Sequence, residues 1–108
     1  MAFTVQFTVG AREDLRTLHG YISENDSQEN ADYFAREIIR AILTLRDFPE
    51  RGAHPPELLQ LGSRSYRQIF FTPYRILYRI SGNTVFIAVI ADERRNMAPL
   101  LARRLPGA

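Results

Sequence analysis

The sequence predicts an α+β fold in which an N-terminal strand and an antiparallel helical hairpin precede a three-stranded antiparallel meander and a short C-terminal helix. Two patterns support this prediction. Apolar residues recur at helical spacing in the first half of the chain, and apolar runs separated by turn residues fill the second half. The length of 108 residues suits a single domain that spans residues 1–108. With 45% hydrophobic and 24% charged residues, the chain has an ordinary globular composition and should bury one modest core.

The first half of the chain is expected to form one strand and two helices. Residues 3–8 alternate apolar with polar side chains, which is typical of a half-buried strand. Apolar residues at helical spacing predict a first helix over residues 10–24 and a longer second helix over residues 28–47. Asn25-Asp26-Ser27 breaks the first helix and caps the second, which Phe48-Pro49 ends. So short a turn predicts an antiparallel pair of helices.

The second half begins with a surface loop over residues 49–62, which contains three prolines and which Pro55-Pro56 should make stiff and extended. We expect Leu58, Leu59 and Leu61 to hold this loop against the body of the protein. Residues 63–80 then predict a β-hairpin.

Residues 83–91 are almost continuously apolar and should form the most buried strand. Residues 92–108 predict a short helix stopped by Pro106-Gly107. The helical hairpin should cover one face of the sheet and leave the other face open or covered by a partner.

The β-hairpin carries several arginines, and its turn at Thr72-Pro73 decides where they point. Arg75 and Arg79 are four residues apart on one strand and therefore share a face, opposite the face that carries Tyr74, Ile76, Tyr78 and Ile80. A two-residue turn would place Tyr66, Gln68 and Phe70 on the arginine face and Arg67 on the apolar face. A longer turn would place Arg67 with Arg75 and Arg79. The sequence leaves this register open.

Charge is distributed unevenly along the chain. All 14 basic residues are arginines, and the net charge is +2. Residues 1–57 carry six arginines and ten acidic residues, whereas residues 58–108 carry eight arginines and two acidic residues. The basic second half suggests an acidic partner, either nucleic acid or an acidic protein segment. The alternative is that these arginines form structural ion pairs with acids of the helices.

Several classes of function are disfavoured by composition. The chain has no cysteine, which excludes disulfides and thiolate catalysis, and its glycines form no phosphate-binding loop. His19 and His54 have no second ligand at metal-binding spacing, so we expect surface histidines, no metal and no cofactor. There is no signal-peptide pattern and no apolar run near the ~20 residues that span a bilayer. We therefore expect a cytoplasmic protein without a membrane partner.

A set of short motifs occurs in order along nearly the whole chain. The motifs are Phe7-Thr8 before Glu13-Asp14-Leu15, Tyr21-Ile22, Phe48-Pro49-Glu50-Arg51-Gly52, Tyr66-Arg67, Pro73-Tyr74-Arg75-Ile76-Leu77-Tyr78-Arg79, the buried strand, and Arg94-Arg95. In these motifs and their spacing the chain resembles the RelE/ParE family of toxins from type II toxin–antitoxin systems. The resemblance implies a helical hairpin packed on an antiparallel sheet, which matches the fold predicted above.

The resemblance implies one of two activities, because the family divides into two branches. RelE-like members cut messenger RNA in the ribosomal A site, and ParE-like members poison DNA gyrase and lack the nuclease residues. Arg67, Arg75 and Arg94 fall at basic positions of the RelE set. A second basic residue of the first hairpin strand is missing, and no tyrosine or histidine follows Tyr78. Because arginine stays protonated, it is a poor general base.

We therefore expect no catalytic residues and favour the ParE-like branch, a toxin that inhibits DNA gyrase. The alternatives are a ribosome-dependent endoribonuclease that uses Arg67, Arg75 and Arg94, or a non-toxic remnant that still binds an antitoxin. In each case the implied partner is an acidic antitoxin that forms a hetero-oligomer with the chain. We expect Arg67, Arg75, Arg79, Arg94 and Arg95 to contact partners. Nucleic acid should be reached only through the antitoxin or the target.

Overall fold

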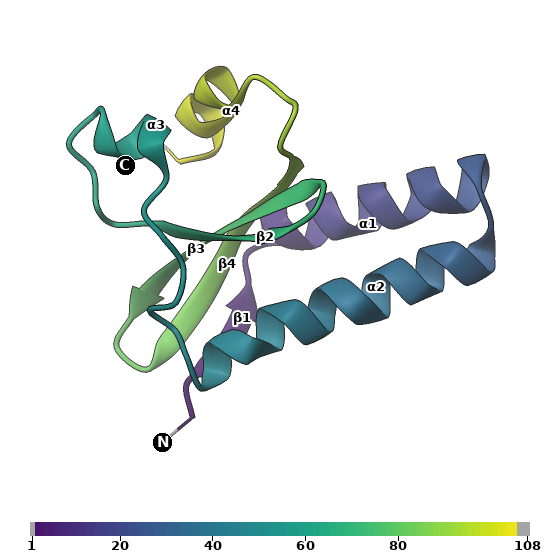
Figure 1. Cartoon of the computed structure of the whole chain (residues 1–108), viewed down its shortest axis with the longest axis horizontal. Coiled ribbons are helices and arrows are strands. Elements are labelled where there is room, and N and C mark those ends of the chain that lie inside the picture. Colours follow the sequence, from purple (N-terminus) through teal and green to yellow (C-terminus); the bar gives the residue numbers. More distant parts are fainter. Residues whose placement is uncertain (1, 106–108) are drawn as a thin grey trace.

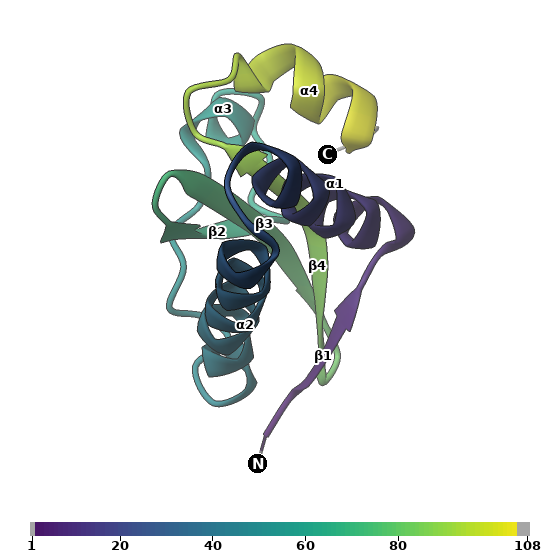
Figure 2. The same ribbon diagram turned by 90° about the vertical axis from the view of Figure 1, so that its right-hand side faces the viewer.

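The computed structural model describes residues 2–105, and Figures 1 and 2 show how its elements are arranged. In chain order the elements are β1 (Thr4–Phe7), α1 (Val9–Asn25), α2 (Gln28–Leu43), the 3₁₀ helix η1 (Thr44–Arg46), α3 (Pro56–Leu59), β2 (Arg67–Phe71), β3 (Tyr74–Ser81), β4 (Thr84–Asp92) and α4 (Met97–Arg104). The predicted α+β order of strand, helical hairpin, three-stranded meander and C-terminal helix is confirmed. The predicted stop at Pro106-Gly107 lies outside the described residues.

The helical hairpin begins at side-chain caps that satisfy free backbone N–H groups. The hydroxyl of Thr8 accepts a hydrogen bond from Ala11 N at 3.1 Å, and that of Ser27 accepts from Asn30 N at 3.0 Å. The prediction of a helix to residue 47 is wrong in its last turn, because α2 ends at Leu43 and η1 follows. Thr44 Oγ1 donates to Ala41 O at 2.6 Å, and this local bond accompanies the tightening of the chain into 3₁₀ geometry.

The four strands form one mixed sheet in the order β1-β4-β3-β2. β4 lies in the middle of the sheet, parallel to β1 and antiparallel to β3, which agrees with its prediction as the most buried strand. The β3–β4 turn is Gly82-Asn83, and Gly82 has φ 59°, a conformation that glycine adopts at little cost. β1 and β2 are therefore the two edges of the sheet.

Each face of the sheet carries its own hydrophobic cluster. Helices α1 and α2 cover one face (Figure 2). There Ile38 and Ile42 pack with Ile76 and Tyr78. The sequence predicts that the second face is open or covered by a partner. It is not open, because α3 and α4 of the chain itself lie over it. The residues of this second cluster are Leu58, Leu77, Ala88, Val89, Ala91, Met97, Leu100, Leu101 and Leu105.

The loop before β2 is held to the second face by fewer leucines than expected. Leu58 is buried there, whereas Leu59 and Leu61 are exposed, so the prediction is wrong for these two residues. The reason is the one-turn helix α3, because a single turn directs only one of its side chains into the sheet. No helix within residues 2–105 combines the length and the apolar character needed to cross a membrane.

The β2–β3 hairpin has the shorter of the two turns considered. Phe71 pairs with Tyr74, so Thr72 and Pro73 form a two-residue turn. Phe70 then lies opposite Arg75, and Arg67 lies opposite Tyr78. Because residues opposite each other across two strands point to the same face, Arg75 and Arg67 point to opposite faces of the sheet. The structure thus decides the register that the sequence left open.

Candidate functional site

Arg75 is a buried member of the sheet, with 6% of its surface exposed. Its Nη1 and Nη2 donate to the two carboxylate oxygens of Glu57 at 2.7 and 2.8 Å, and its Nε donates to Gln68 Oε1 at 2.8 Å. Glu57 reaches this position from α3, which the buried side chain of Leu58 anchors to the sheet. Three charge-assisted hydrogen bonds hold the guanidinium in a fixed orientation.

The electrostatics of this pair show that the charge of Arg75 is matched inside the fold. The hydrogen bonds from Arg75 hold the pKa of the Glu57 carboxyl below its ordinary value of 4.5, against the effect of partial burial. The carboxylate is therefore ionised across the physiological pH range and neutralises the guanidinium. Of the two interpretations considered for the hairpin arginines, the geometry of Arg75 is that of a structural ion pair. Its acid comes from the loop and not from the long helices.

Arg67 lies on the other face of the sheet and binds the loop that follows η1. Its Nη1 donates to the carbonyl oxygens of Glu50 and Gly52 at 3.2 and 2.9 Å. Next to it, the Tyr78 hydroxyl donates to Pro49 O at 2.7 Å and accepts from Gly52 N at 3.1 Å. Arg67 and Tyr78 together attach this loop to the sheet.

Arg79 and Arg94 are stabilised by contacts that leave them within reach of solvent. Arg79 is half-buried, and its guanidinium carbon lies 4.7 Å from the centre of the Phe86 ring, a cation–π distance. Arg94 is exposed, and its Nε donates to Asp92 Oδ1 at 2.9 Å. Hydrogen bonds from Arg94 lower the pKa of Asp92 to about 2, and the side-chain bond to Asp92 raises the pKa of Arg94. Arg95, the next residue, is exposed.

The five predicted arginines are therefore dispersed. Arg75 and Arg79 share a face but are four residues apart along β3, roughly 13 Å at the usual rise of a strand. Arg94 and Arg95 follow the end of β4 nearest the Thr72-Pro73 turn, and Arg67 points to the opposite face. The structure does not bring Arg67, Arg75 and Arg94 together as one basic cluster.

Tyr74 and Tyr78, on the same strand as Arg75 and Arg79, offer no ready proton acceptor. Burial raises the pKa of the Tyr78 phenol, whose hydroxyl is already engaged by the loop. Burial also raises the pKa of the Tyr74 phenol. Both phenols therefore remain protonated at neutral pH. Within residues 2–105 no three His, Cys, Asp or Glu side chains are grouped so that they could hold a metal ion.

Two side-chain pairs that sequence reasoning missed join distant segments. Asp14 binds Arg104 through two hydrogen bonds of 2.9 Å and also accepts from Ile90 N at 2.9 Å. His19 Nε2 lies 2.9 Å from Asp32 Oδ1, and this contact lowers the pKa of Asp32. The sequence contained a clue to the second pair. His19 and Asp32 are equally far from the Asn25-Asp26 turn, so they lie opposite each other in an antiparallel helical hairpin.

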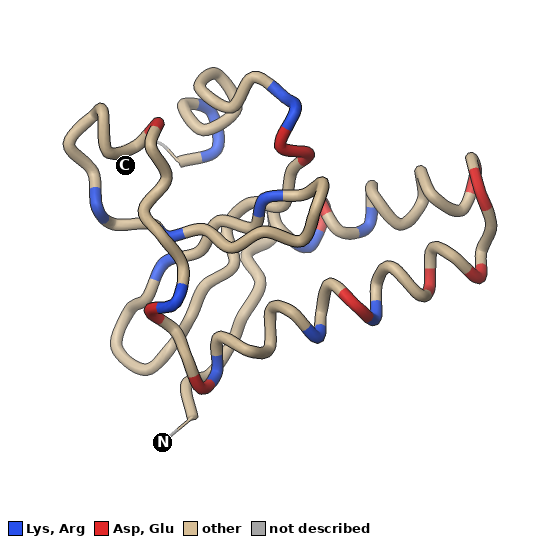
Figure 3. The backbone as a smooth tube through the Cα atoms, viewed as in Figure 1, with Lys and Arg blue, Asp and Glu red and all other residues tan. Residues whose placement is uncertain are grey.

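The charged residues are also separated along the molecule. Figure 3 shows acidic residues gathered around the far tip of the helical hairpin, and several basic residues at the opposite end of the molecule. This matches the acidic first half and the basic second half of the sequence. Acidic ligands should therefore approach the sheet end more readily than the hairpin tip.

The sequence and the fold of this chain are both similar to those of known proteins. A family model described as the ParE toxin of the type II toxin–antitoxin system parDE matches residues 5–97. The fold is similar to that of the chromosomal ParDE toxin–antitoxin system from P. aeruginosa, with a TM-score of 0.71 and 18% identity over 84% of this chain and 96% of that chain. It is also similar to the toxin–antitoxin complex RelBE2 from Mycobacterium tuberculosis, with a TM-score of 0.59 and 24% identity over 85% of this chain and 99% of that chain.

No curated protein shows significant sequence similarity to the chain. At such low identities the two solved structures support the fold alone. The family model, in contrast, extends from β1 to the start of α4 and includes every strand of the sheet. The chain therefore belongs to the ParE toxin family of type II toxin–antitoxin systems.

Proposed function

We propose that this toxin inhibits DNA gyrase without chemistry of its own, and that a cognate acidic antitoxin neutralises it in the cytoplasm. One observation carries the non-catalytic part: the arginines at the RelE-like basic positions are dispersed and engaged. Arg67 and Arg75 point to opposite faces, and Arg75 is paired with Glu57. Cleavage at a ribose 2′-OH needs a base, an acid and a cation around one phosphate. Family membership supports gyrase as the target.

Among the predicted arginines, Arg79, Arg94 and Arg95 are the ones that can contact partners. Arg79 is half-buried on Phe86, and Arg94 and Arg95 are exposed. Arg67 and Arg75 contribute to binding by holding the loop and α3 in place, since Arg67 Nη1 binds the loop and all three guanidinium nitrogens of Arg75 donate within the fold. The partner surface is thus built from cations at both ends of β3 and β4.

The target is tested with purified gyrase, relaxed plasmid and ATP. The toxin should inhibit supercoiling and cause cleaved DNA to accumulate, and prior mixing with the antitoxin should abolish both effects. Unchanged supercoiling at a several-fold molar excess of toxin would sink the proposal. In a parallel translation assay, cuts in the A-site codon that disappear in Arg94→Ala would replace gyrase inhibition by ribosome-dependent cleavage. Arg94 suits this test because it is exposed and its loss should leave the fold intact.

The electrostatic contribution to antitoxin binding is tested at Arg79. Arg79→Glu should weaken the complex at low salt, and the difference from the wild type should shrink as salt increases, because exposed charges are screened. Arg12→Glu is a suitable control, since Arg12 is an exposed cation on α1 and not on the sheet. Equal affinities of wild type and Arg79→Glu at low and moderate salt would show that this arginine does not contact the antitoxin.

A further inference from the structure

The N-terminal strand β1 is an edge of the sheet with hydrogen-bonding groups on its outer side. Thr4 N donates to Asn83 O at 2.9 Å, and Thr8 N donates to Ile87 O at 3.0 Å. Backbone groups of successive residues in a strand point alternately to its two sides. The N–H and C=O groups of Val5 and Phe7 therefore point away from β4. The outward N–H of Phe3 agrees with this alternation, because it donates to Arg46 O of η1 at 2.8 Å.

After the bond from Phe3 N to Arg46 O, the outer edge of β1 has no backbone partner at Val5 or Phe7 among residues 2–105. Within residues 2–105, the backbone hydrogen bonds outside the regular elements include none from Val5 or Phe7. Natural edge strands are commonly protected by proline or by charged side chains. β1 has neither, since its four residues are Thr-Val-Gln-Phe. The edge can therefore accept an additional strand by main-chain hydrogen bonds.

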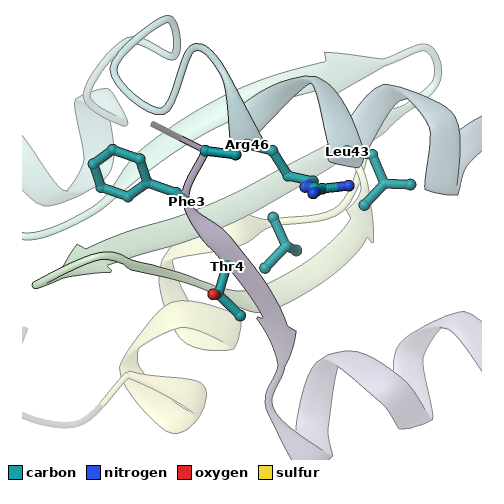
Figure 4. Close-up of a pocket in the computed structure, with 6 residues that line it drawn as sticks. Phe3, Thr4, Leu43 and Arg46 are labelled. Atoms are coloured by element: carbon teal, nitrogen blue, oxygen red, sulfur yellow. The ribbon is translucent and has the colours of Figure 1, made fainter.

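A pocket of about 330 Å³ adjoins this edge, between the start of β1 and the end of α2 (Figure 4). It is lined by Ala2, Phe3, Thr4, Val5, Leu43 and Arg46. Leu43 is 43% exposed although it is apolar. Arg46 is exposed, and no carboxylate of residues 2–105, including that of the adjacent Asp47, forms a salt bridge with it. The pocket thus has a mixed lining, in which apolar side chains such as Val5 and Leu43 lie beside a cation that no carboxylate of residues 2–105 pairs.

We propose that an extended segment of the antitoxin adds to the sheet along β1 and inserts a glutamate side chain into this pocket. The inference rests on the proposed antitoxin partnership and specifies one site for it. The two methylene groups of a glutamate would pack on Leu43 and Val5, and its carboxylate would bind the Arg46 guanidinium. The added strand would bond to the outward groups of Val5 and Phe7. A second copy of β1 is a poorer occupant, because residues 2–8 contain no acidic side chain.

Hydrogen exchange measured by NMR tests the main-chain part of this proposal. The probe is the proposed cognate antitoxin, purified as a complex with the toxin. In the free toxin, the amides of Val5 and Phe7 should exchange quickly and those of Gln6 and Thr8 slowly. In the complex, exchange at Val5 and Phe7 should slow by about tenfold or more, as expected of amides newly bonded in a sheet.

The side-chain part is tested by charge reversal. Arg46→Glu should reduce the affinity for the antitoxin by about tenfold, the scale of one charge-assisted hydrogen bond that is partly exposed to solvent. Arg40→Glu makes the same charge change on α2, on an exposed side chain outside the pocket, and should change the affinity less than about twofold. Circular dichroism of both variants should match the wild type, because neither arginine is buried.

The outcomes separate this proposal from the proposed function. A complex that forms and neutralises the toxin while Val5 and Phe7 exchange as before overturns the β1 site and leaves the antitoxin partnership intact. Equal losses of affinity in Arg46→Glu and Arg40→Glu overturn the glutamate pocket. Failure of any complex to form overturns both proposals. Slow exchange at Val5 and Phe7 in the toxin alone, together with a dimer in sedimentation, overturns the antitoxin as occupant in favour of a second copy.

Discussion

Replacing Glu57 with glutamine tests whether the Arg75 guanidinium is held by the fold or is available to a partner. The substitution keeps the size and shape of the side chain but removes its charge and one of its two acceptor oxygens. Arg75 would remain 6% exposed, with its bond to Gln68 and a single bond to the new amide. A guanidinium in that position is desolvated and incompletely compensated.

The expected loss follows from the burial of the pair. Removing one partner of a fully buried ion pair costs about 3–5 kcal/mol of stability. Here the Glu57 side chain is 31% exposed and the amide still accepts one bond, so the loss should be nearer ~2 kcal/mol. For a domain of this size, that corresponds to a fall in Tm of roughly 8 °C. Urea unfolding followed by far-UV circular dichroism measures the loss directly.

The loss should also depend on pH in a defined direction. Arg75 holds the pKa of Glu57 in the folded state below its ordinary value of 4.5. The stability that this carboxylate contributes is therefore fully present above pH 4.5 and disappears as the pH falls through the lowered pKa. Because glutamine does not titrate, the difference between wild type and Glu57→Gln should be constant near neutral pH and should close in acid.

Glu93→Gln is the matched control, because Glu93 is an exposed carboxylate outside the salt bridges formed by residues 2–105. It should change stability by no more than about 0.5 kcal/mol. Two results would refute the structural role of the Arg75 pair. One is a loss for Glu57→Gln as small as that of the control. The other is a difference that stays the same from about pH 7 to about pH 2.5.

Three further substitutions probe the other contacts that hold the site. Tyr78→Phe removes the bonds to Pro49 O and from Gly52 N and should cost about 1–3 kcal/mol in urea unfolding, because both backbone groups lie in a packed region. Gly52→Ala should cost at least ~2 kcal/mol, since its new Cβ would lie 2.5 Å from Gln68 O. Asp14→Asn weakens the link between α1 and α4 and should speed hydrogen exchange across residues 97–104 more than in β4 outside Ile90, whose N–H donates to Asp14 directly.

Each of these predictions has its own check. Gly20→Ala is the control for Gly52→Ala, because a Cβ at position 20 meets nothing within 4 Å, and alanine should raise stability there by about 0.5–1 kcal/mol. Tyr21→Phe, at a side chain that is 65% exposed, should be nearly neutral beside Tyr78→Phe. If exchange in Asp14→Asn speeds up equally in α4 and β4, the Asp14–Arg104 pair stabilises the whole fold and is not a specific attachment of α4.

Local patterns were enough to predict most of the fold. The apolar stripes of α1 and α2, the capping residue Ser27 and the continuous apolar run of β4 each act within a few residues of chain. Their physical effects, which are burial of one face and satisfaction of backbone groups at helix ends, need no distant partner. The end of α2 was misjudged because a helix pattern alone does not distinguish a last α-turn from a 3₁₀ turn.

The candidate site was predicted only in part, because the sequence indicates the arginines but not the residues that they bind. Arg67, Arg75 and Arg79 stand out in the sequence because fixed charge is unusual in a half-buried hairpin. Glu57 does not stand out, because it lies 18 residues before Arg75 in a loop whose path depends on where Leu58 finds a buried place. A bidentate ion pair forms only when both side chains are brought together by the rest of the fold.

The order of residues thus decided which segments are helices and strands, which family the chain belongs to, and that the second half of the chain is basic. The assembled fold decided the remainder: the length of the Thr72-Pro73 turn, the opposite directions of Arg67 and Arg75, and the open outer edge of β1. The first group depends on interactions between near neighbours in the chain. The second depends on strand register and on contacts between distant segments, which form only when the whole chain packs.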